Sequence, residues 1–435
     1  MNAPARSAEG RGTALLQRVV DVRPHEARAL LLSCAYFFCV LSSYYIIRPL
    51  REEMGVAGGV RNIPWLFTAT MVAMFAVHPP FAALVARLPR GRFIAWANRF
   101  FILNLLVFFF VLRAIEPRHA VWAGRVFFVW TAVFNLFVVS VFWSFITDVF
   151  TSMQGKRLFG FIGFGGTLGG IAGSMVTASL AGPVGPVNLL LASALLLELS
   201  TRAVQALGRT SAMAASDRRS GDHDAVIGGR TTAGMSHVLA SPYLLGICLY
   251  MILFTIGSTT LYLQQAAIAN NSFADAGLRT AFFARIDLAV NILTLLTQMF
   301  LTGRIVKLLG VAVTLTLLPA LSIIGFATLG VAPTIAVFVV FQVLRRAGEF
   351  AVARPAREVL YTVLSREDKY KAKNFIDTFV YRLGDQIGAW SSAGFTAIGM
   401  SAASEAWVAV PLSAVWLGVG LWLGRQQEAR SEAGG

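Results

Sequence analysis

Charged side chains occur within apolar stretches that are long enough to cross a membrane. A charged group near the bilayer centre costs about 2.5–3.5 kcal/mol on insertion scales, so such residues usually face a cavity or a partner. Most of them here are basic and they come from both halves of the chain, as a central cavity for an anionic or phosphorylated solute would require. Arginine suits phosphate because its planar guanidinium offers paired donors. The candidates are Arg48, Arg125, Asp148, Glu198, Arg285, Asp287, Arg345, Arg346, Glu349, Arg382 and Asp385.

The first apolar run ends with two arginines that follow two tyrosines. Arg48 and Arg51 are three residues apart, so a helix places them on one face, with Tyr44 and Tyr45 about one turn earlier. We expect the arginines to attract the anion and the tyrosines to contact a ring of the solute. Pro49 should loosen the helix and free backbone groups to line a cavity. An aromatic belt with arginines snorkelling to the outer interface is the alternative, and the sequence leaves both open.

Two further arginines complete the predicted substrate-binding set. Arg285 lies two residues before Asp287, so the two side chains point to different sides of a helix and each needs another partner. Arg382 and Asp385 have i,i+3 spacing, which fits either a local ion pair or two residues of a site. We therefore include Arg285 and Arg382 as substrate-binding candidates.

Three carboxylates and one lysine are candidates for coupling or gating. Asp148, Glu349 and Asp385 could each take up a coupling proton, and the sequence does not rank them. Glu349 also has i,i+4 spacing from Arg345, which fits a local ion pair equally well. Lys156 stands at the cytoplasmic mouth of a glycine-rich helix, where it could attract anions.

The glycine-rich run 160–173 is a near-match to a dinucleotide-binding fingerprint, but that motif requires a preceding strand. Here the run opens a membrane helix. Gly165, Gly169 and Gly173 repeat every four residues, the small-xxx-small pattern that lets helices approach closely. We therefore interpret the run as a packing surface.

These residues need membrane-spanning helices to position them, and the composition predicts such helices. Of the 435 residues, 56% are hydrophobic and only 14% are charged, against roughly 25% charged in ordinary soluble domains. The charges are also spaced widely, and a span needs about 20 apolar residues. The chain is therefore predicted to be an all-α polytopic membrane protein. The predicted spans are 27–50, 62–86, 94–113, 121–147, 158–181, 186–207, 242–264, 280–302, 311–330, 333–352, 375–400 and 405–424.

The spans form two groups around a polar, Arg/Ser/Asp/Gly-rich segment. About twelve helices in two six-helix halves are typical of a two-repeat, major-facilitator-like transporter. Most lysines and arginines fall in the terminal tails and the even-numbered loops, so the positive-inside rule predicts that both termini and the linker are cytoplasmic. The predicted segments are a basic tail (1–26), an N-terminal bundle (27–207), a linker (208–240), a C-terminal bundle (241–424) and a tail (425–435).

Other functional classes find little support in the sequence. Cys34, Cys39 and Cys248 all lie in apolar stretches and form no metal-binding spacing. No histidine clusters with a carboxylate inside a span, and no nucleophile–base set is present, so we expect neither an enzyme nor a cofactor. The net charge of +15 is largely topological, so a nucleic-acid partner is not needed. The first apolar run is too long for a removable signal peptide and should remain as a span.

Four blocks resemble the ATP:ADP antiporter (nucleotide transporter) family of plastids and intracellular bacteria, a relative of the major facilitator superfamily. They touch both halves of the chain, and the fourth is the most specific. The blocks are Tyr45–Glu52, Phe142–Asp148, Lys156–Gly160 and the stretch from Arg354–Glu358 through Lys371–Asp377 to Arg382–Gly384. Arg51 and Arg357 stand where the family typically has lysine, which keeps the charge. Asp385 also replaces a family lysine, and this reverses the charge.

The resemblance implies an exchange carrier for nucleotides, ATP and ADP among them. From the residues and the resemblance we expect an alternating-access transporter of an organic anion in the lipid bilayer, in a bacterial inner membrane and as a monomer. Asp385 would repel phosphate unless it is protonated or paired with Arg382, which keeps two alternatives open. These are a proton-coupled transporter of an amphipathic or lipid-like solute, and a non-transporting receptor or assembly subunit.

Overall fold

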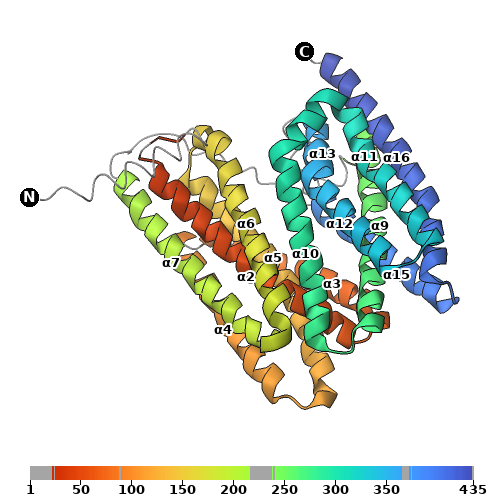
Figure 1. Ribbon diagram of the computed structural model, residues 1–435. Helices are drawn as coiled ribbons and strands as arrows, with labels where there is room; N and C mark the ends of the chain where they lie inside the picture. The colour runs from red at the N-terminus through yellow and green to blue at the C-terminus, as the bar shows by residue number, and fades with distance from the viewer. Residues whose placement is uncertain are drawn as a thin grey trace, which may run out of the picture. The chain divides into compact units, whose positions relative to one another are not determined.

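The structure, a computed structural model, is built of long helices (Figure 1). It describes residues 22–23, 25–87, 90–215, 238, 241–364, 372–373 and 375–433, and within these ranges no strand occurs. Ten helices of the described chain are long and apolar enough to cross a membrane. The predicted class of all-α polytopic membrane protein is therefore confirmed. The candidate spans are Ala27–Ala57, Val60–Val77, Ile94–Ala114, Arg118–Val149, Arg157–Val184, Pro186–Arg209, Pro242–Ser272, Ala276–Phe300, Lys307–Val331 and Ala402–Glu432.

The first half of the chain forms six long helices, and each covers one predicted span. They are α2 (Ala27–Ala57), α3 (Ile63–Arg87), α4 (Arg90–Ala114), α5 (Pro117–Val149), α6 (Ser152–Val184) and α7 (Leu189–Ala215). The expected break between α6 and α7 is present. Gly185, with φ of 87°, caps α6 and is followed by a short 3₁₀ turn that starts at Pro186.

The second half contains long helices and two π-helical turns. Its elements are α9 (Pro242–Ser272), α10 (Ala276–Phe300), α11 (Thr302–Val331), α12 (Ile335–Gly348), the π-turn η3 (Glu349–Ala353), α13 (Arg354–Leu360), the π-turn η4 (Ile376–Val380), α15 (Tyr381–Ala397) and α16 (Ala402–Ala433). Most of the predicted linker lies outside the described residues, which resume at 238 and 241.

Two expectations about helix ends change. The first helix does not end at residue 50 as predicted, because α2 continues through Pro49 to Ala57. The predicted spans 333–352 and 375–400 are helical, but each contains a π-turn and several charged residues. The regular helices beside these turns, α12 and α15, have only 14 and 17 residues, so neither appears among the ten apolar helices. The number twelve stays a prediction.

The chain divides into two compact units. Among the described residues, unit 1 takes its members from 1–54, 72–223 and 275–288. Unit 2 takes its members from 55–71, 224–274 and 289–435. The first half of α10 thus packs with the helices of unit 1. The predicted bundle boundaries stay predictions.

In unit 1 the glycine stripe of α6 packs directly on the backbone of α2. A Cβ atom added to Gly169 would lie 2.3 Å from the carbonyl oxygen of Phe38, and one added to Gly173 would lie 2.4 Å from that of Ser42. The Ser42 hydroxyl donates a hydrogen bond of 2.9 Å to the Gly169 carbonyl. Only glycine permits this approach, so the interpretation of the run as a packing surface holds.

A similar contact joins α9 and α15 in unit 2. A Cβ atom on Gly384 would overlap the Thr255 hydroxyl, and one on Gly388 would lie 3.0 Å from the Cα of Ile256. In the predicted repeat, α2 and α9 are the first helices of their halves, and α6 and α15 are the fifth. The recurrence of glycines four residues apart at this pair supports a two-repeat architecture.

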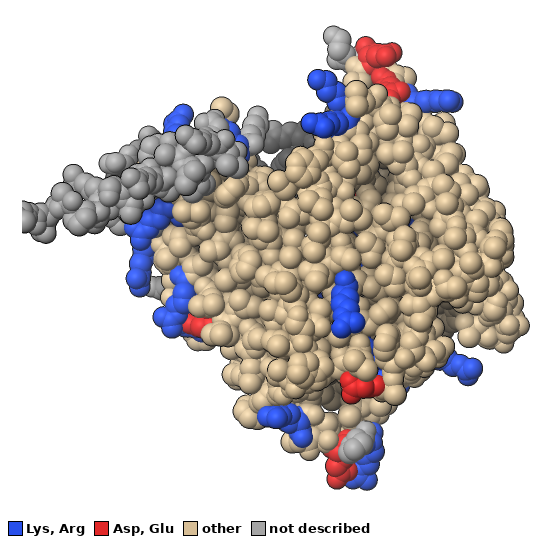
Figure 2. Space-filling model, viewed as in Figure 1, with Lys and Arg blue, Asp and Glu red and all other residues tan. Residues whose placement is uncertain are grey.

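The face of the molecule in Figure 2 is largely uncharged, and most of the Lys, Arg, Asp and Glu residues that it shows lie near the edges of the view. The described chain also exposes many large apolar side chains, including Trp96, Phe110 and Leu308. A soluble surface rarely exposes apolar side chains on this scale, whereas a lipid-facing surface requires them.

Candidate functional site

Arg48 of α2 lies between two carboxylates of unit 1. Its Nη1 is 3.1 Å from Oδ1 of Asp287 on α10, and its Nε is 3.9 Å from Oε1 of Glu52. The Arg48 side chain is 21% exposed, whereas that of Asp287 is only 4% exposed. The arginine therefore has an internal counter-ion but keeps an accessible edge.

Arg51, one turn further along α2, is more tightly enclosed. Its Nη1 lies 2.9 Å from Oε1 of Glu52, and its Nε donates to the carbonyl oxygen of Phe128 at 3.2 Å. The guanidinium carbon also stands 3.8 Å from the centre of the Phe128 ring, within cation–π range. These contacts fix Arg51 against α5.

A third ion pair joins the end of α2 to the start of α10. Nη2 of Arg279 lies 2.7 Å from Oε1 of Glu53, and both side chains are largely buried. We use the name α2 ion-pair cluster for this set of three arginines and three carboxylates, whose formal charges cancel. Its members are Arg48, Arg51, Glu52, Glu53, Arg279 and Asp287.

The two predicted ring-contact residues lie beside this cluster. The rings of Tyr44 and Tyr45 meet edge to face with centroids 5.4 Å apart, and both residues are half-buried. The guanidinium carbon of Arg48 is 5.7 Å from the Tyr45 ring. The structure thus brings Tyr44, Tyr45, Arg48 and Arg51 together on one helix.

Arg285 differs from the other predicted arginines because it is exposed. It is two residues from the buried Asp287, and the two side chains face different environments, as their spacing predicts. Within the described ranges it makes no ion pair. Arg285 is therefore the accessible cation of α10.

In unit 2, Asp385 is paired as its spacing with Arg382 allows. Oδ2 of Asp385 lies 3.2 Å from Nη1 of Arg382, and Oδ1 accepts a hydrogen bond from the hydroxyl of Thr259 at 3.3 Å. The Arg382 side chain is 32% exposed. The negative charge that departs from the family pattern is thus compensated locally.

Glu349 and Arg345 do not form the local pair that their i,i+4 spacing suggests. Glu349 accepts from Nη1 of Arg357 at 3.3 Å. Arg345 instead donates to the hydroxyls of Ser258 and Ser322 and to the Phe254 carbonyl. The backbone between the two residues is still regularly helical, since the Glu349 N–H donates to the Arg345 carbonyl, so the spacing rule fails because each side chain has partners on other elements.

The remaining coupling candidates lie at the junction of α5 and α6. Asp148 is exposed near the end of α5, and the side chain of Lys156 lies outside the described part of the chain. Arg157, its neighbour, is 3.2 Å from Glu26. Burial tends to raise the pKa of Glu26, but hydrogen bonds from the Arg23 backbone N–H and from Gln154, with the charge of Arg157, hold it below its ordinary value.

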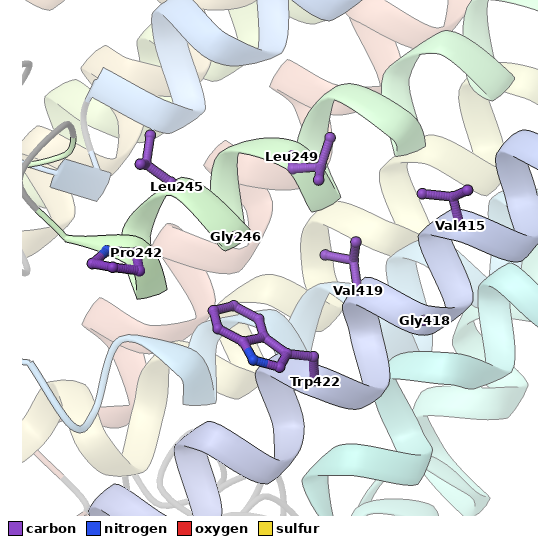
Figure 3. A pocket seen from close by; sticks show the side chains of 8 residues that line it. All are labelled: Pro242, Leu245, Gly246, Leu249, Val415, Gly418, Val419 and Trp422. Atoms are coloured by element: carbon purple, nitrogen blue, oxygen red, sulfur yellow. The ribbon is translucent and has the colours of Figure 1, made fainter.

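A groove of about 450 Å³ between α9 and α16 offers no competing anion site. Figure 3 shows Leu245 and Leu249 on one side, Val415 and Val419 on the other, and the indole of Trp422. All of its lining residues are apolar or glycine apart from that ring nitrogen. Such a surface suits acyl chains rather than phosphate.

Solved structures identify the fold. The chain matches a bacterial homologue of the iron transporter ferroportin with a TM-score of 0.66 and 13% identity, over 92% of this chain and 98% of that chain. It matches a mutant form of the nucleoside transporter NupG with a TM-score of 0.59 and 14% identity, over 93% and 99% of the two chains. The protein therefore has the fold of major-facilitator-like membrane transporters.

Sequence relatives narrow this class. The chain is 22% identical to the ADP,ATP carrier protein 1 of Chlamydia trachomatis serovar D, over 91% of this chain and 88% of the relative. It is 20% identical to that of Chlamydia pneumoniae, over 91% and 90%. No family model matches the chain. The predicted resemblance to the ATP:ADP antiporter family is nevertheless confirmed, because its relatives over almost the whole chain are ADP,ATP carrier proteins.

Proposed function

We propose that the protein carries a nucleotide or another phosphorylated organic anion across a membrane by alternating access between two six-helix halves. The observation that carries the proposal is the match to ADP,ATP carrier proteins along 91% of the chain. The accessible edge of Arg48 beside two tyrosines supports it, because guanidinium and aromatic rings are the groups that phosphate and a nucleobase select. Relatives and structural neighbours that are transporters also favour a carrier over an enzyme.

Substrate phosphate would exchange with a carboxylate in this arrangement. In the α2 ion-pair cluster Arg48 already binds Asp287, so an arriving phosphate takes over the donors that the carboxylate now occupies. Arg285 and Arg382 supply further positive charge, and Tyr44 and Tyr45 supply the ring contact. Asp148, Glu349, Asp385 and Lys156 remain candidates for coupling or gating.

Energetics restrict the direction and mode of transport. Each charge that crosses 100 mV is worth about 2.3 kcal/mol, so importing a tetra-anion alone would cost about 9 kcal/mol. Import therefore needs exchange for another anion or co-transport of cations, whereas export needs neither. We favour exchange, in line with the names of the relatives.

We place the protein in a bacterial inner membrane, as a monomer with both termini in the cytoplasm. The positive-inside distribution of lysine and arginine supports this orientation. The helix ends that carry Glu26, Arg157 and the basic loops would then face the cytoplasm. The start of α10 would face the opposite side.

Uptake into liposomes tests the proposal directly. Purified protein is reconstituted into vesicles loaded with unlabelled ATP or ADP, and entry of labelled ATP and ADP is measured. We expect uptake well above that of protein-free vesicles and increased by the internal nucleotide. No uptake above empty vesicles would mean that nucleotide exchange is wrong.

A matched pair of variants assigns the flux to the α2 ion-pair cluster. Arg48→Gln should reduce uptake at least tenfold, because it removes the guanidinium on which substrate phosphate is proposed to replace Asp287. Arg118→Gln removes the same charge from an exposed position in the first turn of α5, where the arginine pairs with Glu116 outside any predicted site. It should leave uptake unchanged, and size-exclusion profiles verify that both variants are folded.

A further inference from the structure

Unit 2 contains a cavity that is lined by none of the candidate site residues described above. It has a volume of about 610 Å³ and is lined by residues of α9, α11, α12, α15 and α16 and of the segment that leads into α3. This volume is within the usual range of small-molecule sites, roughly 300–1,000 Å³. We call it the Glu405 cavity after the acidic residue in its wall.

Glu405 is a buried carboxylate with one oxygen unsatisfied. The residue is 8% exposed, and its Oε1 has no hydrogen-bond partner in the described structure. Gln264, which also lines the cavity, donates its amide to the carbonyl oxygen of Ala402 at 3.3 Å and so does not satisfy this oxygen. Since burying an ionised carboxylate without a full set of partners is costly, a cationic donor that reached this oxygen would be bound favourably.

The other lining residues define the rest of such a ligand. Phe338 and Leu263 are buried and apolar, so the body of a ligand would be apolar as well. Among the described residues, Arg61 is the only other charged one that lines the cavity, and it is exposed. Water and salt screen an exposed charge much more than a buried one, so an ionised Glu405 would attract a cation in the cavity more strongly than Arg61 repels it.

We propose that the Glu405 cavity binds a small organic cation, a primary ammonium with an apolar body, whose ammonium donates to Oε1 of Glu405. The carboxylate supplies the charge, and the apolar wall selects the size of the body. None of the residues that line this cavity belongs to the α2 ion-pair cluster, so the proposal does not depend on the proposed function.

Calorimetry with three probes of similar size tests the proposal. Benzylammonium, benzyl alcohol and benzoate are titrated at neutral pH into the full-length protein in detergent, with titrations into protein-free micelles subtracted. We expect saturable binding of benzylammonium, and affinities at least tenfold weaker for the alcohol and for benzoate. Equal binding of the alcohol, or no binding of the ammonium, overturns the proposal.

Variants locate the binding. Glu405→Gln should weaken benzylammonium binding at least tenfold, whereas Glu432→Gln, which removes the same charge from an exposed position of α16, should not change it. Ala267→Phe fills the cavity without altering its charge and should abolish binding even where Glu405→Gln fails to fold. Undiminished binding in a folded Ala267→Phe protein overturns the proposal. Nucleotide flux is measured separately, so the two proposals can fail independently.

Discussion

At the scale of single residues, the arginines on α2 are balanced rather than exposed as a positive patch. The sequence identifies Arg48 and Arg51 as candidates for substrate binding, and it predicts that two tyrosines lie about one helical turn before them. It does not identify Glu52 as a ligand shared by both arginines, nor Asp287 as the partner of Arg48. The second pairing depends on how α10 packs against α2, and no spacing rule contains that information.

Replacing Asp287 with asparagine should tighten anion binding if the carboxylate competes with substrate. A hydrogen bond to a charged group is worth about 1.5–3 kcal/mol, and every 1.4 kcal/mol is about tenfold in affinity. We therefore expect the Kd for ATP to fall by about tenfold, measured by calorimetry on purified protein. Asp275→Asn is the control, because Asp275 caps the start of α10 and asparagine caps equally well. A weaker affinity in Asp287→Asn would assign the carboxylate to folding instead.

Arg345 shows how a buried cation can be stabilised without a carboxylate. It is 2% exposed, donates to three neutral acceptors, and lies within 6 Å of the rings of Phe254 and Trp416. The planar fork of arginine serves several acceptors at once, which the compact lysine ammonium cannot do. The residue thus ties α12 to α9, α11 and α16.

Arg345→Lys should therefore lower the free energy of unfolding by about 1–3 kcal/mol for the lost hydrogen bonds. Thermal unfolding of the purified protein in detergent measures this as a lower Tm. Arg304→Lys makes the same chemical change at an exposed position and should leave the Tm unchanged. An unaltered Tm in Arg345→Lys would show that the guanidinium hydrogen bonds of Arg345 do not contribute to the stability of the fold.

At the scale of elements, the contact between α2 and α6 depends on missing side chains. The spacing of the glycines predicts close packing but not the partner helix, which tertiary structure supplies. Other glycines of α6 have no such role, since a Cβ atom on Gly163 would meet nothing within 4 Å. The same helix therefore contains both a test position and its control.

Gly169→Ala should destabilise the protein by about 1–3 kcal/mol, the range for overpacking, because the Phe38 backbone cannot move aside. Gly163→Ala should stabilise it by about 0.5–1 kcal/mol, since alanine is the better residue inside a helix. Thermal unfolding of the two variants in parallel gives the comparison. Equal shifts in the same direction would contradict the close contact.

The two predicted spans that contain π-helical residues are those whose structure is least predictable from the sequence. Long apolar runs locate α2, α5, α9 and α11 but not all of their ends, since α9 ends at Ser272 rather than at 264 and α11 begins at Thr302 rather than at 311. Spans 333–352 and 375–400 contain charged residues, and each includes a five-residue π-turn that no sequence period indicates. Their length could be predicted, but not the partners of Glu349 and Arg345.

At the scale of the whole molecule, the sequence predicts the class, the fold and the family resemblance. Hydropathy and charge spacing predict the membrane-spanning helices, and the four sequence blocks carry the resemblance. It does not predict the Glu405 cavity. Glu405 reads as the first residue of the span 405–424, and only the packing of α9, α15 and α16 shows it to be enclosed. Burial of a single carboxylate is a property of tertiary structure.

The proposed topology can be tested with reporters that are active on one side of the membrane. Fusions of a fluorescent protein to either terminus should fluoresce, because the basic tails are retained in the cytoplasm. Alkaline phosphatase inserted after Arg118 should be active, because the junction of α4 and α5 then lies on the outer side of the membrane. Phosphatase fusions at both termini serve as controls and should be inactive. Phosphatase activity at one terminus only would require an odd number of spans.

The pairing of Arg48 with Asp287 bears on what the vacant carrier can do. A half-buried cation left without a counter-ion after the substrate departs would oppose the return of the empty carrier, and the cycle would stop until new substrate arrived. With a resident carboxylate the vacant form is already electroneutral at this point. We therefore expect the empty carrier to return across the membrane, so that net transport of substrate occurs beside one-for-one exchange. Asp287→Asn should abolish the net transport and leave obligatory exchange.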